Sequence, residues 1–96
     1  MTISADRQMV ADVLALAPEA AKQFFDFVKP LIVTIVRRYV GLEDRDHVLN
    51  GVLVHIWKEN WRVLRKWDGQ SPLRGYLAAV VKNFCVDHVR NRPPPF

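Results

Sequence analysis

The most constraining feature of the sequence is one proline-bounded segment, residues 71–92, whose pattern predicts a single helix. Ser71 is a favoured N-cap residue, because its side-chain oxygen can accept a hydrogen bond from a free backbone N–H of the first turn. Pro72 is favoured at the first helical position, because proline has no backbone N–H that would need a partner there. Three consecutive prolines from Pro93 then prevent the helix from continuing. Apolar spacing of three and four residues predicts the buried face: Leu73, Leu77, Val80, Phe84 and His88.

A second row of side chains on this segment is polar and lies beside the predicted core face. It consists of Tyr76, Asn83, Asp87 and Arg90, which also recur at helical spacing. A helix with one buried side and one polar edge is suited to recognition of a partner. We therefore expect the rest of the chain to hold this helix in place.

Three further helices are predicted upstream, since apolar residues recur at helical spacing and strand-like alternation is weak. They cover residues 1–17, residues 18–40 with a kink or division at Pro30, and residues 44–66. A chain of 96 residues is enough for one domain. The expected fold is all-α, a compact bundle of about four helices over residues 1–92, with residues 93–96 beginning a proline-rich linker.

Composition places the chain among ordinary globular proteins, with half of its residues apolar and a quarter charged. No apolar run approaches the length of a membrane span, and the N-terminus lacks a signal-peptide pattern. The single Cys85 excludes an internal disulfide and is expected to be a small buried hydrophobe. These features favour a cytoplasmic protein without membrane contact.

Positive charge is concentrated in the second half of the chain. Residues 57–96 contain eight Lys or Arg and three Asp or Glu, whereas residues 1–56 contain six and seven. A basic half that also carries three tryptophans favours a polyanionic partner, nucleic acid above all. The alternative is that these charges only solvate helix faces, and charge alone does not decide between the two.

The predicted helix 44–66 carries an unusual strip between its core and its solvent face. The expected core residues are Val48, Val52, Ile56, Val63 and Trp67, and the strip is formed by Asn50, Val54, Trp57 and Trp61. Such a strip indicates either a wide core or a docking surface for a partner. We expect Trp57 to belong to the core and Trp61, which lies farther round the helix, to be exposed.

A short polar connection, Asp68-Gly69-Gln70, joins this helix to the last one, between Trp67 and Ser71. Such a loop could accept one unstacked base by aromatic stacking and hydrogen bonding, although an ordinary connector is the simpler interpretation. Four cations without sufficient acidic neighbours surround it and are expected to contact phosphates: Arg62, Arg65, Lys66 and Arg74. Lys82, beside Asn83, could contact a further phosphate.

Catalytic and metal-binding patterns are absent from the sequence. His47 and His55 are eight residues apart on one predicted helix, and no acidic or Cys cluster completes a ligand set. The glycines are isolated, so no phosphate-binding loop is formed. We therefore expect a protein that is not an enzyme and that uses no cofactor or metal.

Three segments in order resemble region 2 of bacterial sigma factors of the small extracytoplasmic-function (ECF) type. They are DRDHVLNGVLVHIW, WDGQSPLRGYL and AAVVKNFCVDHVRNR. The family has an acidic start before a Trp, then a Gly-containing loop, and finally an Ala-x-Asn-x-x-x-Asp-x-x-Arg signature. The positions that match in register are Trp57, Tyr76-Leu77, Asn83, Asp87 and Arg90, and the resemblance covers roughly residues 24–92.

The resemblance implies that this domain binds the clamp helices of core RNA polymerase and reads the −10 element of promoter DNA on the non-template strand. A flipped base would enter the loop 67–71, and Asn83 would contact the upstream part of the element. The DNA-binding residues so expected are Arg62, Arg65, Lys66, Trp67, Asp68, Gly69, Gln70, Ser71, Arg74, Tyr76, Lys82, Asn83 and Asp87. The polymerase-binding residues are Asp46, His47, Asn50, Val54, Trp57 and Trp61.

The sequence departs from the family at two points. It has His47, Asn50 and Gly51 where the family has an acidic-Gln-Glu face, and it lacks the module that reads the −35 element. A chain that stops at a proline run is expected to be part of a longer protein, with a free-standing relative as the alternative. In the family an anti-sigma factor covers these surfaces. A helical DNA-binding or protein-interaction module without polymerase is the other functional class.

Overall fold

The computed structural model describes residues 3–91, and in this range the protein is an all-α bundle of four helices. They are α1 (Ile3–Leu14), α2 (Ala20–Tyr39), α3 (Arg45–Arg65) and α4 (Leu73–Arg90), with a short 3-10 turn, η1 (Leu42–Asp44), before α3. The predicted fold class is therefore confirmed. The expected linker at residues 93–96 lies outside the described residues.

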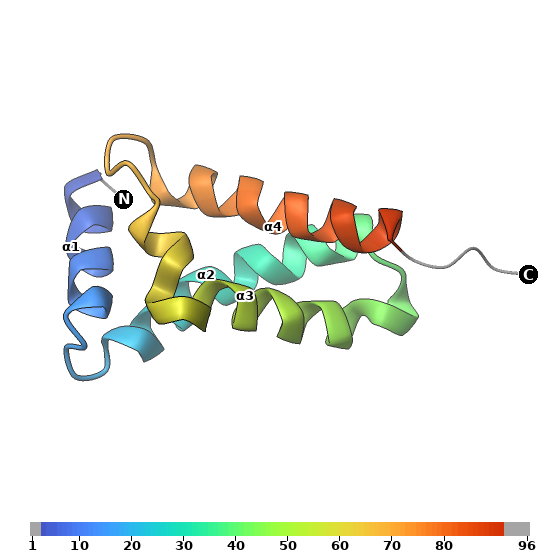
Figure 1. Ribbon diagram of the computed structural model, residues 1–96, viewed down its shortest axis with the longest axis horizontal. Helices are drawn as coiled ribbons and strands as arrows, with labels where there is room; N and C mark the ends of the chain where they lie inside the picture. Colours follow the sequence, from blue (N-terminus) through green and yellow to red (C-terminus); the bar gives the residue numbers. More distant parts are fainter. Residues whose placement is uncertain (1–2, 92–96) are drawn as a thin grey trace, which may run out of the picture.

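The helices are arranged as three long elements and one crossing element. Figure 1 shows α2, α3 and α4 extending along the long axis of the molecule, while α1 crosses one end of them. The loop between α3 and α4 lies at that same end, close to the start of α1. This arrangement brings the two chain regions farthest apart in sequence, residues 3–14 and 66–73, to one end of the bundle.

The core is formed by residues spaced four apart on three helices. Its fully buried side chains include Phe24, Val28 and Ile32 of α2, Val48, Val52 and Ile56 of α3, and Leu73, Leu77, Val81 and Cys85 of α4. Burial also raises the pKa of the Cys85 thiol, as expected for a small buried hydrophobe. α2 continues through Pro30, whose carbonyl accepts a hydrogen bond from Thr34 Oγ1 at 2.9 Å, so the helix is not divided there.

The predicted core face of α4 is wrong in its second half. Val81 and Cys85 are buried, whereas Val80, Phe84 and His88 are only half-buried. The buried residues are spaced four apart. Because one turn of the helix takes 3.6 residues, this row winds slowly around the helix and forms a ridge along the i±4n direction. α4 packs mainly on α2 along this ridge. A buried face with alternating spacings of three and four residues would instead require neighbouring helices that lie nearly parallel to α4.

α3 contains a break that the sequence pattern does not predict. Lys58 is extended (φ −64°, ψ 159°), and Glu59, Asn60 and Trp61 are all left-handed, with φ between 56° and 61°. The ribbon changes direction at this point and its last turn rises toward α4 (Figure 1). Left-handed geometry costs roughly 1–2 kcal/mol per non-glycine residue, less for Asn, so other contacts must stabilise the break.

Burial of Trp61 is one compensation for this strain. Its ring packs edge-on against Phe24 at a centroid distance of 5.7 Å and in a tilted arrangement against Phe25 at 5.5 Å. Trp61 is 7% exposed and Trp57 is 58% exposed, so the expected order of exposure of the two tryptophans is wrong. The break accounts for the reversal, because four non-helical residues reset the helical register between them.

None of the helices within residues 3–91 combines the length and apolar character needed to cross a membrane.

Candidate nucleic-acid interface

The loop between α3 and α4 contains several hydrogen bonds among its own polar groups. Oδ1 of Asp68 accepts hydrogen bonds from the backbone N–H of Gln70 (2.9 Å), the N–H of Ser71 (3.2 Å) and the Ser71 hydroxyl (3.2 Å). The bonds from Gln70 and then Ser71 lower the pKa of the Asp68 carboxyl. Nε1 of half-buried Trp67 donates to the Ser71 carbonyl at 3.0 Å and closes the turn. The loop therefore has a defined conformation.

Side chains of this loop remain available to a ligand. Gln70 is exposed, and its side-chain amide makes no hydrogen bond to another described residue. Gly69 has φ +73°, a conformation that strains any residue with a Cβ. The loop thus presents an exposed amide three residues after the Trp67 ring, and these two kinds of group can contact the edge and the face of an unstacked base.

The expected cap of α4 is wrong. Pro72, not Ser71, lies at the N-cap position, and no side chain at this position accepts a helix N–H; the Ser71 hydroxyl instead donates to Asp68. The N–H of Leu73, the first helical residue, instead donates to Oδ2 of Asp6 in α1 at 3.0 Å. Arg7 Nε also donates to the carbonyl of Gly69.

A cationic hollow of about 300 Å³ lies between α3, on both sides of its break, and the first half of α4. Its lining consists of His55, Lys58, Arg62, Val63, Lys66, Tyr76 and Val80, without an acidic residue. The side-chain ammonium groups of Lys58 and Lys66 make no hydrogen bond or close ion pair with other described residues. Burial, followed by the charges of Lys58 and Arg62, lowers the pKa of His55. The hollow is therefore suited to a phosphate group.

Tyr76 forms one wall of this cationic hollow. Its hydroxyl donates to the Val63 carbonyl at 2.7 Å and thereby ties α4 to the last turn of α3. Burial raises the pKa of the Tyr76 hydroxyl, so this donor stays protonated. Tyr76 thus fixes the spacing of the two helices that carry the cations.

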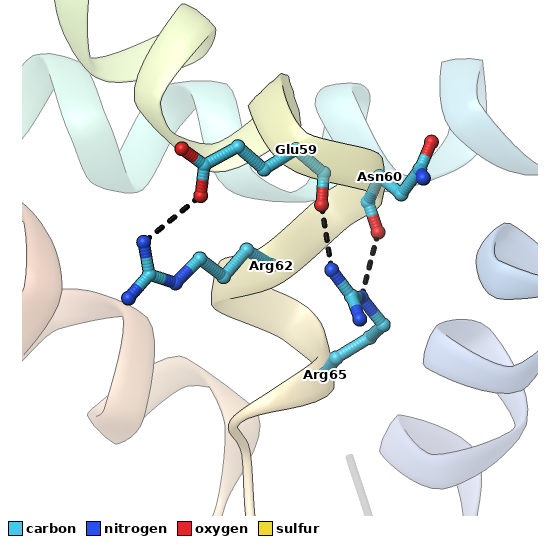
Figure 2. Close-up of polar contacts among 4 residues, drawn as sticks. All are labelled: Glu59, Asn60, Arg62 and Arg65. Atoms are coloured by element: carbon cyan, nitrogen blue, oxygen red, sulfur yellow. Dashed lines mark hydrogen bonds and ion pairs between the residues drawn. The ribbon is translucent and has the colours of Figure 1, made fainter.

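Two of the predicted phosphate contacts have partners within the protein (Figure 2). Nη1 of Arg62 pairs with Oε2 of Glu59 at 2.9 Å, and Arg65 donates to the carbonyls of Asn60 (2.9 Å) and Glu59 (2.6 Å). The expectation that no acidic neighbour balances these arginines is therefore wrong for Arg62. Arg65 satisfies carbonyls of the left-handed turn, and it lines a different hollow.

That second hollow, the apolar hollow, combines exposed Leu and Trp side chains with four polar residues and lies on the other side of the break. It has a volume of about 650 Å³ and is lined by Leu14, Leu16, Trp57, Lys58, Glu59, Asn60, Trp61 and Arg65. Leu16 is 81% exposed and, like Trp57, is a large apolar side chain without cover. Such exposure is typical of a surface that meets another protein.

The remaining predicted DNA contacts lie along α4. Arg74, Lys82, Asn83 and Asp87 are all exposed, and the amide of Asn83 makes no hydrogen bond to another residue in the described range. Ten residues separate Leu73 from Asn83, about 15 Å along a helix. Asn83 and the loop would therefore contact different nucleotides. Lys82 lines a third hollow, with Arg38 and Tyr39 of α2.

The predicted polymerase-binding residues are mostly accessible. Asp46, His47, Asn50, Val54 and Trp57 are exposed on the first part of α3, whereas Trp61 is not. Gly51 is not on this face: a Cβ there would lie 3.1 Å from the Phe84 ring, so Gly51 allows α3 and α4 to approach closely. The departure from the family at Gly51 therefore falls in a helix contact.

Sequence reasoning missed four residues of the site: Asp6, Arg7, His55 and Lys58. A signal for Asp6 was present, because it is in register with the buried Val10 and Val13 on α1. A carboxylate in an apolar row is expected to have a structural partner. His55 and Lys58 lie at three- and four-residue spacing on the chain before Arg62, but the sequence does not show that they line one hollow with Tyr76. Among residues 3–91, no group of His, Cys, Asp or Glu could hold a metal ion.

No family model, no curated protein and no solved structure matches the chain.

Proposed function

We propose that this chain is a sigma-factor domain of the ECF type, which binds core RNA polymerase and reads the promoter −10 element as single-stranded DNA. The observation that carries the proposal is the ordered loop 68–71, with its unengaged Gln70 amide, which begins two residues after Lys66 of the cationic hollow. The ordered sequence resemblance over residues 24–92 points to the same function. Such a domain acts in the cytoplasm, where polymerase and promoter DNA are present.

Each part of the site has a distinct role in this proposal. Lys58, Arg62 and Lys66 bind phosphates and contribute affinity without sequence preference. Gln70 and the Trp67 ring take the flipped base, and Asn83 reads a base farther upstream, since an amide can both donate to and accept from a base edge. No step requires a cofactor or a catalytic residue.

The polymerase would bind the exposed face of the first part of α3. Val54 and Trp57 are three residues apart and share one side of the helix, with exposed fractions of 53% and 58%. Together with Asp46, His47 and Asn50 they form a mixed apolar and polar surface. An anti-sigma factor that occupies the same surface would compete with polymerase.

Binding to bacterial core RNA polymerase tests the proposal. We expect Val54→Asp to weaken binding at least tenfold, because a charge in a protein interface remains desolvated and unpaired. Val89→Asp is the matched control, since Val89 on α4 is exposed to a similar extent, 50%. If the wild-type domain does not bind polymerase, or if the two variants behave alike, the polymerase part of the proposal is wrong.

A protein-interaction module without polymerase is the second candidate function, and the apolar hollow at Leu14, Leu16 and Trp57 favours it. The two functions differ in their response to DNA. The interaction module would not bind single-stranded DNA, whereas the sigma-factor domain would bind it with a preference at particular bases.

A further inference from the structure

α1 contacts the loop between α3 and α4 at two places. Arg7 Nε donates to the carbonyl of Gly69, inside the loop, and Asp6 Oδ2 accepts the N–H of Leu73, the residue directly after it, at 3.0 Å. The partners are 62 and 67 residues apart in sequence. Adjacent residues of one helix therefore hold both sides of Gln70, the residue proposed to meet the flipped base.

Asp6 is an unusual residue to bury. It is 3% exposed, and its Oδ1 has no hydrogen-bond partner within residues 3–91. A buried carboxylate with one unpaired oxygen contributes little net stability, because its desolvation opposes the bond that it makes. Its clear structural effect is geometric: it fixes where the first N–H of α4 points.

The loop does not supply this cap itself. Pro72 at the N-cap position has no side-chain acceptor, and the Ser71 hydroxyl donates to Asp68 without accepting a helix N–H. The first N–H groups of a helix need an acceptor and favour a negative charge. Asp6 provides both from outside the loop, so the conformation of residues 68–72 depends on where α1 lies.

We propose that Asp6 and Arg7 are positioning residues for the loop: they contact no DNA but set the conformation in which Gln70 meets the base. α1 thereby determines base preference at the loop and leaves the position read by Asn83 unaffected. This inference rests on the proposed DNA-reading function of the loop, although its structural part can be tested without DNA.

Amide hydrogen exchange of the free protein tests the structural part. The measured quantity is the exchange rate of the Leu73 amide relative to that of Val81, in the middle of α4, so that global unfolding cancels. We expect Asp6→Ala to raise this ratio by about tenfold, the size of a lost helix cap. Asp6→Asn should raise it less, because the amide oxygen can still accept the bond. Asp12→Ala on the same helix is the matched control and should leave it unchanged.

Selection from a pool of randomised single-stranded DNA tests the functional part with two conservative variants, Asp6→Asn and Arg7→Lys. Arg7→Lys keeps the charge, and so the salt dependence, but not the guanidinium geometry at Gly69. We expect each variant to lose about half or more of the wild-type discrimination at the loop position, with the position read by Asn83 unchanged. If Asp6→Ala does not fold, Asp6→Asn and Arg7→Lys still test the positioning role.

Two results would overturn the positioning role. One is a Leu73-to-Val81 exchange ratio that is the same in Asp6→Ala and wild type, and the other is an equal loss of preference at both base positions. A wild-type protein without any base preference would contradict the proposed function instead, and the exchange ratio would then still decide whether α1 positions the loop.

Discussion

The two hollows on either side of the break in α3 share Lys58 but differ in chemistry. The hollow toward α4 is lined by His55 and three cations without an acidic residue, whereas the hollow toward α1 combines exposed Leu14, Leu16 and Trp57 with cations, Glu59 and Asn60. The break in α3 therefore lies between a cationic surface and a surface with exposed apolar side chains. An unbroken helix would place Trp57 and Trp61 on neighbouring parts of one face. The difference teaches that local backbone strain here creates both the proposed DNA surface and an apolar surface.

The largest expected effect distinguishes the two tryptophans that flank the break. Trp61→Ala should lower the free energy of unfolding by roughly 3–5 kcal/mol, because it removes a buried indole packed on Phe24 and Phe25. Trp57→Ala should change it by less than about 1 kcal/mol, as for an exposed side chain. Denaturant titration measures both. Equal losses would show that the break does not separate a buried from an exposed tryptophan.

A smaller effect is expected at Arg65, which satisfies two carbonyls of the left-handed turn. Arg65→Ala should lower the free energy of unfolding by about 1–2 kcal/mol, since hydrogen bonds from a charged donor are lost at an exposed site. Arg62→Ala, which removes only a surface ion pair with Glu59, should cost about 0–1 kcal/mol. If Arg62→Ala is the more destabilising variant in the same titration, Arg65 does not stabilise the break.

Salt dependence separates the two hollows directly. Lys66→Ala should reduce the slope of log affinity for single-stranded DNA against log salt by about 0.7, the value for one lost phosphate contact. Trp57→Ala, on the apolar hollow, should leave the slope unchanged. A slope that does not respond to Lys66→Ala would remove the cationic hollow from the DNA-binding surface.

The smallest expected effect is a pH dependence from His55. Burial, with Lys58 and Arg62, holds its pKa below the ordinary value of 6.5, so the unfolded state binds more protons in this range. Its contribution to stability is therefore complete above pH 6.5 and decreases as the pH falls below it. Bound DNA phosphate should raise the His55 pKa, which a titration of the His55 ring protons by NMR measures. An identical pKa with and without DNA would place the phosphates elsewhere.

The fold was predictable from sequence because helical spacing and proline punctuation mark all four helices. The break in α3 was not, since Lys58-Glu59-Asn60 contains no Gly or Pro and its geometry depends on Trp61 packing against α2. The loop and Asn83 could be identified as candidates from their order in the chain. The cap from Asp6 could not, because a contact across 67 residues leaves no local signature in Ser71-Pro72.

The central claim, that the loop and α4 read DNA bases, is tested most directly by base preference. The measurement is selection from randomised single-stranded DNA by the wild type, Gln70→Ala and Asn83→Ala, each checked for helical content. A good base contact contributes roughly 1–3 kcal/mol of discrimination, about fivefold to over a hundredfold. We predict that Gln70→Ala loses preference at one position and Asn83→Ala at a different, upstream position. Folded variants that keep the full wild-type preference at every position would contradict the account.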